Sequence, residues 1–488
     1  MRFARSDEPP RGKKAGLPSL LPEAGYAVIG SAPGIRTEPA TITFLHKSQI
    51  CNTLAALIGP VRPLSTFNLM KASTLPNLRH LRIFETVARL ESVSAASEEV
   101  HLSQPAVSQA MAKLEQFFAT QLFERRRSGS YPTQAGSILQ FRTERLFSQI
   151  EQAIQGLLGR FPPDEQSGSH LATNKITGAH IAVLVHIAEK GGFEPAANSI
   201  GISQASLHRT ARDLEKIMRR AIFRRTARGV ATTESGTELA RRLKLAALEI
   251  EYAMEQIEAL RGTARSRISI GVSPMANSLF LAYAINDLLI EYPNSKIVVV
   301  ERPYSVLLNA LRFGDTDIVY GMLRRPEGVA DIAEQAFFLD PYCIVVRRGH
   351  PLTRLARITA NDLVRYDWVM PGPNSPRRHI FEEIFSGLNA EPTTTIETAS
   401  LTTHLSALCC SDRISLLKQE EIQLHEQLGL LVPLPFDVPL PDKPYGITTR
   451  ANWHPTPVQQ RLIQIMCERA QRQQSTRLSQ PLFAEETQ

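Results

Sequence analysis

The chain has 488 residues, of which 43% are hydrophobic and 21% are charged, and these globular proportions exclude a wholly disordered or collagen-like protein. The length suggests roughly three domains. The net charge of +7 is compatible with a nucleic-acid partner but does not require one. The five cysteines, of which only Cys409 and Cys410 are close in sequence, form neither a disulfide framework nor a zinc motif. We therefore expect a cytoplasmic protein with no metal and no other cofactor.

The first 76 residues contain scattered proline and glycine without apolar periodicity, so we expect a disordered extension there. They include no apolar stretch like that of a signal peptide. The longest uncharged run, Ile268–Asn286, approaches the ~20 residues that a membrane span needs, but serines and Pro274 interrupt it. We predict a strand, a turn and a buried helix in this run, and no membrane contact.

Two stretches, 78–136 and 178–236, resemble each other without a gap at a constant offset. Apolar residues occupy the same positions in both stretches. The residues expected to begin and end helices also recur at the same positions. The matched positions include Ser103-Gln104 with Ser203-Gln204, Leu114-Glu115 with Leu214-Glu215, and Gly136 with Gly236. The chain therefore carries two copies of one module.

Each copy predicts three helices followed by a basic hairpin. In the first copy, apolar spacing predicts a helix near 81–88, and small residues predict a short one over 94–100. Ser103 is placed to cap a third helix, whose first turn tolerates Pro105. The third helix buries an apolar stripe at helical spacing, made of Val107, Met111, Leu114 and Phe118. A helix, a tight turn and a helix with a polar N-terminal face have the geometry that enters a DNA major groove.

The predicted DNA contacts lie on the third helix and the hairpin of each copy. In the first copy they are Ser103, Gln104, Pro105, Ala106, Ser108, Gln109, Lys113, Arg125, Arg126 and Arg127. In the second copy they are Ser203, Gln204, Ser206, His208, Arg209, Arg212, Arg225 and Arg228.

The second copy departs from the first, because Ala205 replaces Pro105 and His208 replaces Ser108. It is either a second reader of bases or a remnant that only dimerises. No His or Cys lies near His208 at metal-ligand spacing, so we expect this side chain to face the groove rather than to bind a metal.

Long amphipathic helices are predicted over 134–158 and 237–261, with a linker at 160–173. Strands and helices alternate after Gly262, which predicts a mostly parallel sheet with ligands at the carboxyl ends of its strands. The expected strands are 268–273, 296–301 and 317–322, separated by helices 277–291 and 305–314. Strand-like segments at 337–347, 368–370 and 414–417 indicate a second α/β lobe.

Several spaced motifs carry a family resemblance. Leu102–Ser108, Leu122–Arg125 and Thr133–Gly136 resemble the winged helix-turn-helix of LysR-type transcriptional regulators. Tyr292-Pro293 and Gly314–Asp317 are similar to the effector domain of that family, which has the two-lobed fold of periplasmic binding proteins. The segment 448–457 resembles the branch that regulates galactose-binding protein genes.

The resemblance implies a multidomain protein with two winged helix-turn-helix modules, rich in helix and joined to long linker helices, before a two-lobed α/β domain. The expected divisions are a disordered extension (1–76), the first module and its helix (77–159), a linker (160–173), the second module and its helix (174–262), an effector domain (266–470) and a disordered tail (471–488).

By the same resemblance, a small-molecule effector binds between the lobes. The implied contacts are Ser273, Pro274, Tyr304, Tyr342, Arg378, Ser400, Leu401 and Thr402. The implied partners are double-stranded DNA, RNA polymerase and an effector that is a small organic acid, a sugar or an aromatic metabolite. A homodimer or homotetramer is expected.

The chain contains no Gly-x-Gly-x-x-Gly, P-loop, His-Glu-x-x-His or Gly-x-Ser-x-Gly motif, so we expect a regulator rather than an enzyme. The alternative is a small-molecule-binding protein or an enzyme with a vestigial DNA-binding module. The two long helices pair either within one chain, as a covalent pseudo-dimer that reads two unlike half-sites, or with their counterparts in a partner chain.

Overall fold

The computed structural model of the chain describes residues 75–158, 172–227, 229–262, 266–273, 278–324, 329–373, 375–388, 392–438 and 443–479. The expected N-terminal extension therefore lies outside the described residues, except for Leu75 and Pro76. The expected linker lies outside them up to residue 171, while Ala172 and Thr173 belong to a helical turn.

The first module has the predicted order of elements. It consists of α2 (Leu78–Leu90), α3 (Val93–Glu99), α4 (Gln104–Phe118), the antiparallel hairpin of β1 (Phe123–Arg126) and β2 (Gly129–Pro132), and the long helix α5 (Gln134–Leu158). The side chains of Asn77 and Ser92 cap α2 and α3 by accepting backbone N–H bonds. The predicted apolar stripe of α4 is buried, as expected.

The second module repeats the first element by element. It consists of α7 (Gly178–Lys190), α8 (Phe193–Ile200), α9 (Gln204–Met218), the hairpin of β3 (Phe223–Thr226) and β4 (Gly229–Thr232), and α10 (Glu234–Ala259). The same hydrogen bond fastens each hairpin, since Glu115 accepts from the Leu122 N–H and Glu215 from the Ile222 N–H, both at 2.9 Å. The shared signals in the sequence therefore mark shared contacts.

The glycine near the start of each long helix is required by close packing. A Cβ at Gly136 would lie 2.1 Å from the Leu122 carbonyl oxygen, and one at Gly236 would lie 2.3 Å from that of Ile222. Because these neighbours are backbone atoms, a side chain does not fit without moving the hairpin away from the helix. Each glycine thus lets a module dock on its own long helix.

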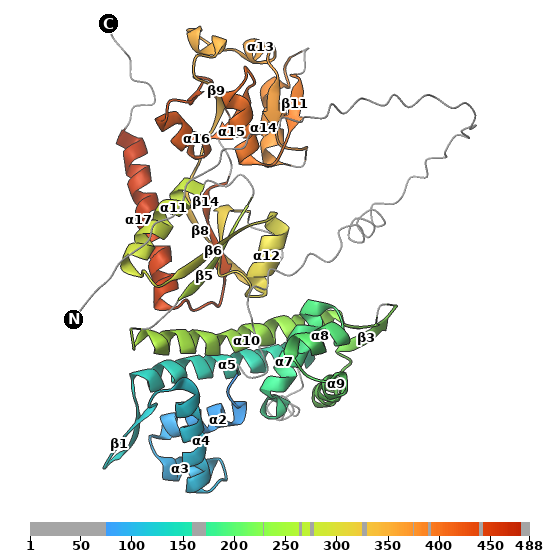
Figure 1. Cartoon of the computed structure of the whole chain (residues 1–488), viewed down its shortest axis with the longest axis vertical. Helices are drawn as coiled ribbons and strands as arrows, with labels where there is room; N and C mark the ends of the chain where they lie inside the picture. The colour runs from blue at the N-terminus through green and yellow to red at the C-terminus, as the bar shows by residue number, and fades with distance from the viewer. Residues whose placement is uncertain are drawn as a thin grey trace, which may run out of the picture. The chain divides into compact units, whose positions relative to one another are not determined.

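Helices α5 and α10 lie side by side in antiparallel directions (Figure 1). Arg142 near the start of α5 contacts residues near the end of α10, whereas Gly156 near the end of α5 contacts Arg242 near the start of α10. Buried apolar residues recur along both helices at alternating steps of three and four, including Leu146 and Ile150 on α5 and Leu243, Ala246 and Ile250 on α10. This spacing is typical of two helices that share one apolar seam.

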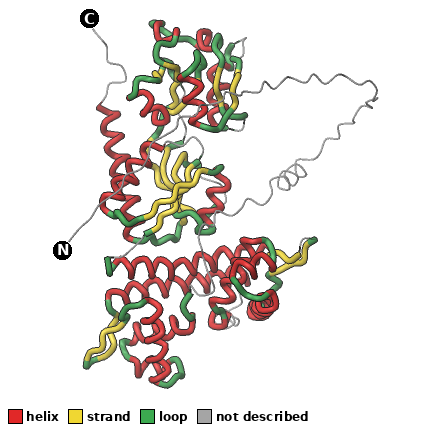
Figure 2. The backbone as a smooth tube through the Cα atoms, in the orientation of Figure 1, coloured by secondary structure: helices red, strands yellow, loops and turns green. Residues whose placement is uncertain are grey.

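The chain then forms a first α/β lobe. Its elements are β5 (Arg267–Val272), α11 (Ser278–Glu291), β6 (Lys296–Glu301), α12 (Tyr304–Arg312), β7 (Ile318–Met322), β8 (Ile332–Phe338), β14 (Tyr445–Arg450) and α17 (Pro457–Ser479). The strand order is β6-β5-β7-β14-β8 (Figure 2). The pairs β5–β6 and β5–β7 are parallel, and β14 runs against both of its neighbours.

A second lobe is inserted between β8 and β14. Its elements are β9 (Tyr342–Arg347), the 3-10 turn η2 (Pro351–Arg354), α13 (Ala360–Leu363), β10 (Trp368–Met370), α14 (Pro376–Phe385), β11 (Thr394–Glu397), α15 (Leu401–Cys409), β12 (Ser415–Lys418), α16 (Gln419–Gln427) and β13 (Leu431–Pro433). β9 lies between β12 and β13 in an antiparallel sheet, while β10 and β11 are parallel.

Four expectations need correction. The sheets are not mostly parallel, because β14 runs antiparallel to β7 and β8, and the sheet of β12, β9 and β13 is antiparallel throughout. The segment 337–347 is not one strand, because it contains the end of β8, the passage from the first lobe to the second, and β9. The second long helix begins at Glu234 rather than at 237, since Thr233 caps it. The expected tail is helical up to Ser479, because α17 continues to pack along the first lobe. Among the described helices, none combines the length and apolar character needed to cross a membrane.

Candidate DNA-binding surface and ligand cavity

The N-terminal half of α4 presents the predicted polar face. Ser103, Gln104, Pro105, Gln109 and Lys113 are exposed, and Ala106 and Ser108 are half-buried. The Gln104 amide nitrogen donates to the Ser94 hydroxyl at 2.9 Å, which holds the side chain beside the turn between α3 and α4. Amide, hydroxyl and ammonium groups at a helix start can read base edges or bind phosphate.

The first hairpin carries three exposed arginines in a row. The Arg126 guanidinium lies 3.1 Å from the Glu124 carboxylate and 5.3 Å from the Tyr131 ring centre, so this side chain already has partners. Arg125 and Arg127 are exposed on either side of it. Exposed guanidinium groups at a hairpin tip suit sequence-independent phosphate contacts.

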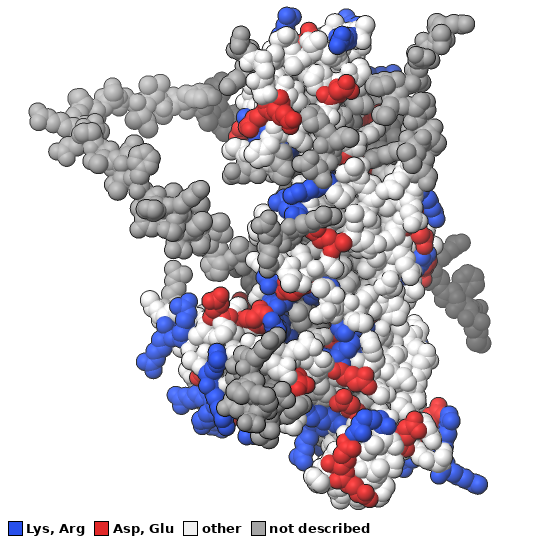
Figure 3. All heavy atoms as spheres, turned by 180° about the vertical axis from the view of Figure 1, so that it is seen from behind, with Lys and Arg blue, Asp and Glu red and all other residues white. Residues whose placement is uncertain are grey.

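The second module is more basic at the corresponding helix. Ser203, Gln204, Ser206, His208, Arg209 and Arg212 of α9 are exposed, as is Arg225 on the hairpin. Arg228 lies outside the described residues. The His208 ring packs 4.5 Å from the Phe193 ring, and among the described residues no cluster of three or more His, Cys, Asp and Glu side chains could hold a metal ion. Figure 3 shows basic side chains gathered over this module and at the tip of the first hairpin.

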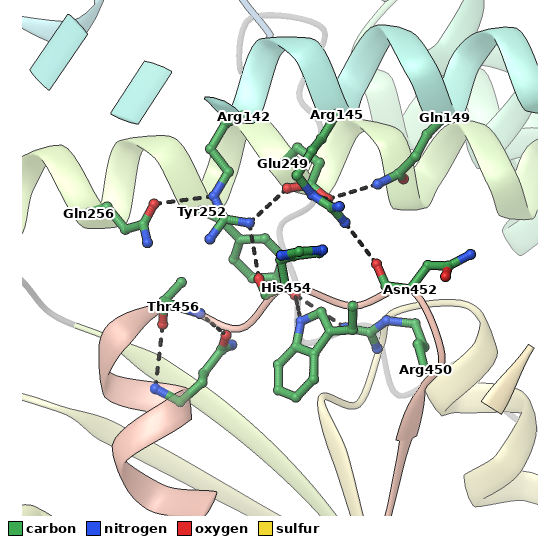
Figure 4. Close-up of polar contacts among 12 residues, drawn as sticks. Arg142, Arg145, Gln149, Glu249, Tyr252, Gln256, Arg450, Asn452, His454 and Thr456 are labelled. Carbon is green, nitrogen blue, oxygen red and sulfur yellow. Dashed lines mark hydrogen bonds and ion pairs between the residues drawn. The ribbon is translucent and has the colours of Figure 1, made fainter. Parts of the chain in front are cut away.

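A buried polar cluster joins α5 to α10. Arg142 is 1% exposed and Glu249 is 3% exposed, and the Arg142 Nη1 donates to the Glu249 carboxylate at 2.8 Å. Arg145 and Gln149 donate to the other oxygen of the same carboxylate at 2.9 and 2.7 Å. Gln256 accepts from the Arg142 Nε at 3.1 Å. All of these groups converge on Glu249 and Arg142 in Figure 4.

The same cluster attaches the helix pair to the first lobe. Arg142 donates to the His454 carbonyl at 3.0 Å, and Arg145 donates to the Asn452 carbonyl at 2.7 Å. Both carbonyls lie in the loop between β14 and α17 (Figure 4). Any movement of this loop therefore changes contacts that position α5.

A second buried joint links the second module to the first lobe. Lys244 of α10 is 1% exposed, and its Nζ lies 2.6 Å from the carboxylates of both Glu189 and Asp315. Burial acts to lower the pKa of Lys244, but Asp315 and Glu189 outweigh burial and raise the pKa above its ordinary value. The ammonium group is therefore held charged between α7 and the loop before β7.

A cavity of about 670 Å³ opens between the two lobes. It lies beyond the carboxyl ends of β5, β7 and β10, where ligands of α/β sheets bind. Its wall contains Ser273, Pro303, Tyr304, Ser305, Met322, Arg324 and Tyr445 from the first lobe, and Tyr342, Pro371, Gly372, Pro373, Ser375, Arg377, Ala399 and Lys418 from the second.

Three of the residues expected to contact an effector line this cavity, namely Ser273, Tyr304 and Tyr342. Pro274 lies outside the described residues. Ser400, Leu401 and Thr402 form the start of α15 beside the lining residue Ala399, and Ser400 caps the helix by accepting from the Thr403 N–H. They are not part of the wall.

The cationic lining residues differ from the one expected. Arg378 lies 3.5 and 3.8 Å from the carboxylates of Glu382 and Glu397, while its neighbour Arg377 lines the cavity. Sequence reasoning also missed Lys418. Lys418 could have been found from the sequence, because this residue comes directly after an apolar run and ends strand β12. Ligands bind at the carboxyl ends of such strands.

Comparison with known proteins agrees with this organisation. The family model of the LysR substrate binding domain matches residues 261–471. The model of the bacterial regulatory helix-turn-helix protein, lysR family, matches twice, at 78–137 and 179–237. The matched ranges together cover more than half of the chain.

Several relatives are transcriptional regulators. The chain is 29% identical over 379 residues to the HTH-type transcriptional regulator GalR of Pseudomonas putida, covering 77% of this chain and 93% of that protein. It is 26% identical over 302 residues to PcaQ of Agrobacterium fabrum, covering 62% of this chain and 97% of that protein. Its identity to GbpR of Azospirillum brasilense is 27% over 270 residues, covering 55% of this chain and 79% of that protein.

Matches among solved structures include full-length OxyR from Pseudomonas aeruginosa, with 21% identity, a TM-score of 0.44 and coverage of 60% of this chain and 94% of that one. Another is LysG from Corynebacterium glutamicum with bound effector Arg, with 17% identity, a TM-score of 0.46 and coverage of 60% and 97%. With both helix-turn-helix copies and the substrate-binding domain matched, the chain belongs to the LysR family of DNA-binding transcriptional regulators.

Proposed function

We propose that one chain of this regulator forms a covalent pseudo-dimer, in which two winged helix-turn-helix modules read two unlike half-sites. The modules are 77–159 and 174–262, and a periplasmic-binding-protein-like domain (266–470) controls them by binding an effector between its lobes. The protein acts in the cytoplasm, contacts RNA polymerase at its promoters, forms homodimers or homotetramers and is not an enzyme.

The antiparallel pairing of α5 and α10 supports the proposal. Each module precedes one of these helices, so antiparallel pairing brings the two modules to opposite ends of the pair. The helices have 25 and 26 residues, which corresponds to a length of about 38 Å at 1.5 Å per residue. One turn of DNA, the usual separation of two half-sites, is about 34 Å.

The ion pair of Arg142 and Glu249 is the observation that carries the proposal. The counterparts of these residues in the repeat are Arg242 and Gln149. An α5–α5 pair in the same register would bring Gln149 instead of Glu249 against each Arg142. A buried arginine without a carboxylate costs about 3–5 kcal/mol, so α5 favours α10 over a second α5.

The covalent link between the modules favours pairing within one chain. Tethered segments meet at an effective concentration in the millimolar range, whereas α10 of another chain is available only at the concentration of the protein. The competing arrangement is an exchange of α10 between chains, which keeps the same ion pair but joins modules of different chains.

Different side chains at equivalent positions support unlike half-sites. Where α4 has Ser108 and Gln109, α9 has His208 and Arg209, and arginine favours guanine whereas glutamine favours adenine. All four side chains are exposed or half-buried. The operator should therefore lack the palindromic symmetry expected when two identical modules bind.

A footprint on the promoter region of the regulator's own gene tests the proposal. Gln104→Ala should abolish protection of one half-site, and Arg209→Ala should abolish protection of the other. Gln116→Ala, on the exposed C-terminal part of α4, is the matched control and should leave both protected. If both variants lose protection of the same half-site, or if Arg209→Ala leaves both half-sites protected, the proposal that each module recognises its own half-site is refuted.

A further inference from the structure

The wall of the interlobe cavity carries positive charge. Three cationic side chains line it, Arg324, Arg377 and Lys418, and its described wall contains no carboxylate. Arg324 is exposed at the rim and lies over the Tyr304 ring at 4.6 Å. The other two cations belong to the second lobe and are buried, so they can be used only by a ligand inside the cavity.

Lys418 is 2% exposed, and its Nζ has no hydrogen-bond partner among the described residues. The ammonium group lies 4.2 Å from the Tyr445 ring centre and 4.9 Å from that of Tyr342. These rings belong to different lobes. Lys418 therefore stands where the lobes meet, and its ammonium group faces one tyrosine ring of each lobe.

Arg377 is 5% exposed and only partly paired. Its Nη2 donates to both oxygens of Glu421, at 2.7 and 2.9 Å, while its Nη1 has no partner among the described residues. The guanidinium also lies 5.5 Å from the Tyr342 ring centre. Lys418 and Arg377 thus share one ring, and each keeps donors for a further acceptor.

Tyr304 provides a third unsatisfied donor on the opposite wall. Its buried hydroxyl has no hydrogen-bond partner among the described residues. Buried polar groups without partners are rare in native proteins because each costs stability. Three of them around one cavity indicate that a ligand supplies the acceptors.

A bound anion would change the charge balance around Lys418. Burial lowers the pKa of Lys418 to about 8, although the nearby Asp340 and Glu421 act in the opposite direction and Arg377 adds to the lowering. Burial likewise raises the pKa of Asp340 to about 7. Burial therefore disfavours full ionisation of these groups, and an anion beside Lys418 would stabilise the charged lysine.

We propose that the effector is a small organic acid, whose carboxylate binds Lys418 Nζ and Arg377 Nη1 while the Tyr304 hydroxyl donates to its far end. This inference rests on the proposed role of the cavity as the effector site, and it selects the acid over a neutral sugar. The tyrosine rings hold the body of the ligand, and a ligand bound by residues of both lobes would favour their closed arrangement.

Thermal unfolding of the full-length protein without DNA tests the charge of the ligand. The probes are matched pairs at 10 mM, namely 4-hydroxybenzoate with 4-hydroxybenzamide and glucuronate with glucose. Because charge-assisted hydrogen bonds are stronger than neutral ones, the acids should raise the midpoint and their neutral partners should not. Midpoint shifts from the neutral compounds alone, or from none of the four, would overturn the proposal.

Lys418→Met identifies the site. The variant removes a buried charge and should fold, and calorimetric affinity for the better acid should fall by roughly 10- to 100-fold. Lys296→Met, on an exposed lysine of β6, changes the net charge equally and should leave the affinity unchanged. Equal affinity of wild type and Lys418→Met would refute the assignment.

Tyr304→Phe removes one hydroxyl group and tests the opposite wall independently. A loss of about 5- to 20-fold in affinity for the same acid is expected, and unchanged affinity would remove Tyr304 from the site. These outcomes are separable from the function proposed above. If neutral compounds bind and the DNA footprints are those expected above, the proposal of an organic-acid effector is refuted, whereas the proposal of two paired DNA-binding modules stands.

Discussion

Arg142 and Glu249, 107 residues apart in the chain, form a 2.8 Å ion pair across the seam of α5 and α10. Both side chains are buried. Arg142 and its neighbour Arg145 also attach the helix pair to the first lobe, by donating to the carbonyls of His454 and Asn452 (Figure 4). One cluster therefore joins the two helices and attaches the first lobe to them.

Breaking this pair should destabilise the protein strongly. Glu249→Gln leaves Arg142 and Arg145 without their shared carboxylate and should lower the free energy of unfolding by about 3–5 kcal/mol, as measured by urea denaturation. Arg89→Met, which removes an exposed ion pair with Glu99, is the control and should cost no more than about 1 kcal/mol. Similar losses in both variants would mean that the buried pair has no special role.

Base reading and phosphate binding should separate within the first module. Gln104→Ala should weaken binding to the specific site while leaving random DNA nearly unaffected, because an amide reads base edges. Arg127→Ala should weaken binding to both and reduce the slope of log affinity against log salt by about one. Titrations of both DNAs at several salt concentrations measure this difference, and identical effects of the two variants would contradict the groove assignment.

Acid binding should weaken as the pH rises. Burial lowers the pKa of Lys418 to about 8, and a bound carboxylate would raise that pKa. Affinity should therefore fall above pH 8, by at most tenfold per pH unit for one proton. Asp340, with its pKa raised to about 7, becomes anionic over pH 6–8 and acts in the same direction. Calorimetry from pH 6 to 9 measures the trend, and Lys418→Met should remove the part of it above pH 8.

The repeat made much of the fold predictable. Signals such as Ser103-Gln104 and Gly136 recur in the second copy, and both copies form the same helices and hairpin at equivalent positions. Apolar alternation predicted most strands of the first lobe. It missed the passage from β8 to β9, because apolar residues flank Asp340-Pro341 on both sides although the chain changes lobes there.

The cavity was harder to predict. Arg377 and Arg378 are adjacent, and one residue along a helix rotates the side chain by about 100°, so the sequence alone could not decide which one lines the cavity. Lys418 and Tyr445 meet through pairing between distant segments. The sequence also left the partner of α5 undecided. A heptad-like apolar stripe indicates that a helix pairs with another helix, but it does not show which helix that is.

Crosslinking in mixed-isotope protein tests intrachain pairing most directly. Chains carrying Gln152→Cys and Arg242→Cys, which lie on facing parts of α5 and α10, would be prepared in light and heavy isotopic forms on a background with Cys409→Ser and Cys410→Ser. The two forms would be unfolded together, refolded and treated with a short bismaleimide. Intrachain pairing predicts crosslinked peptides that are entirely light or entirely heavy, whereas a statistical share of light–heavy peptides would show that α5 and α10 pair between chains.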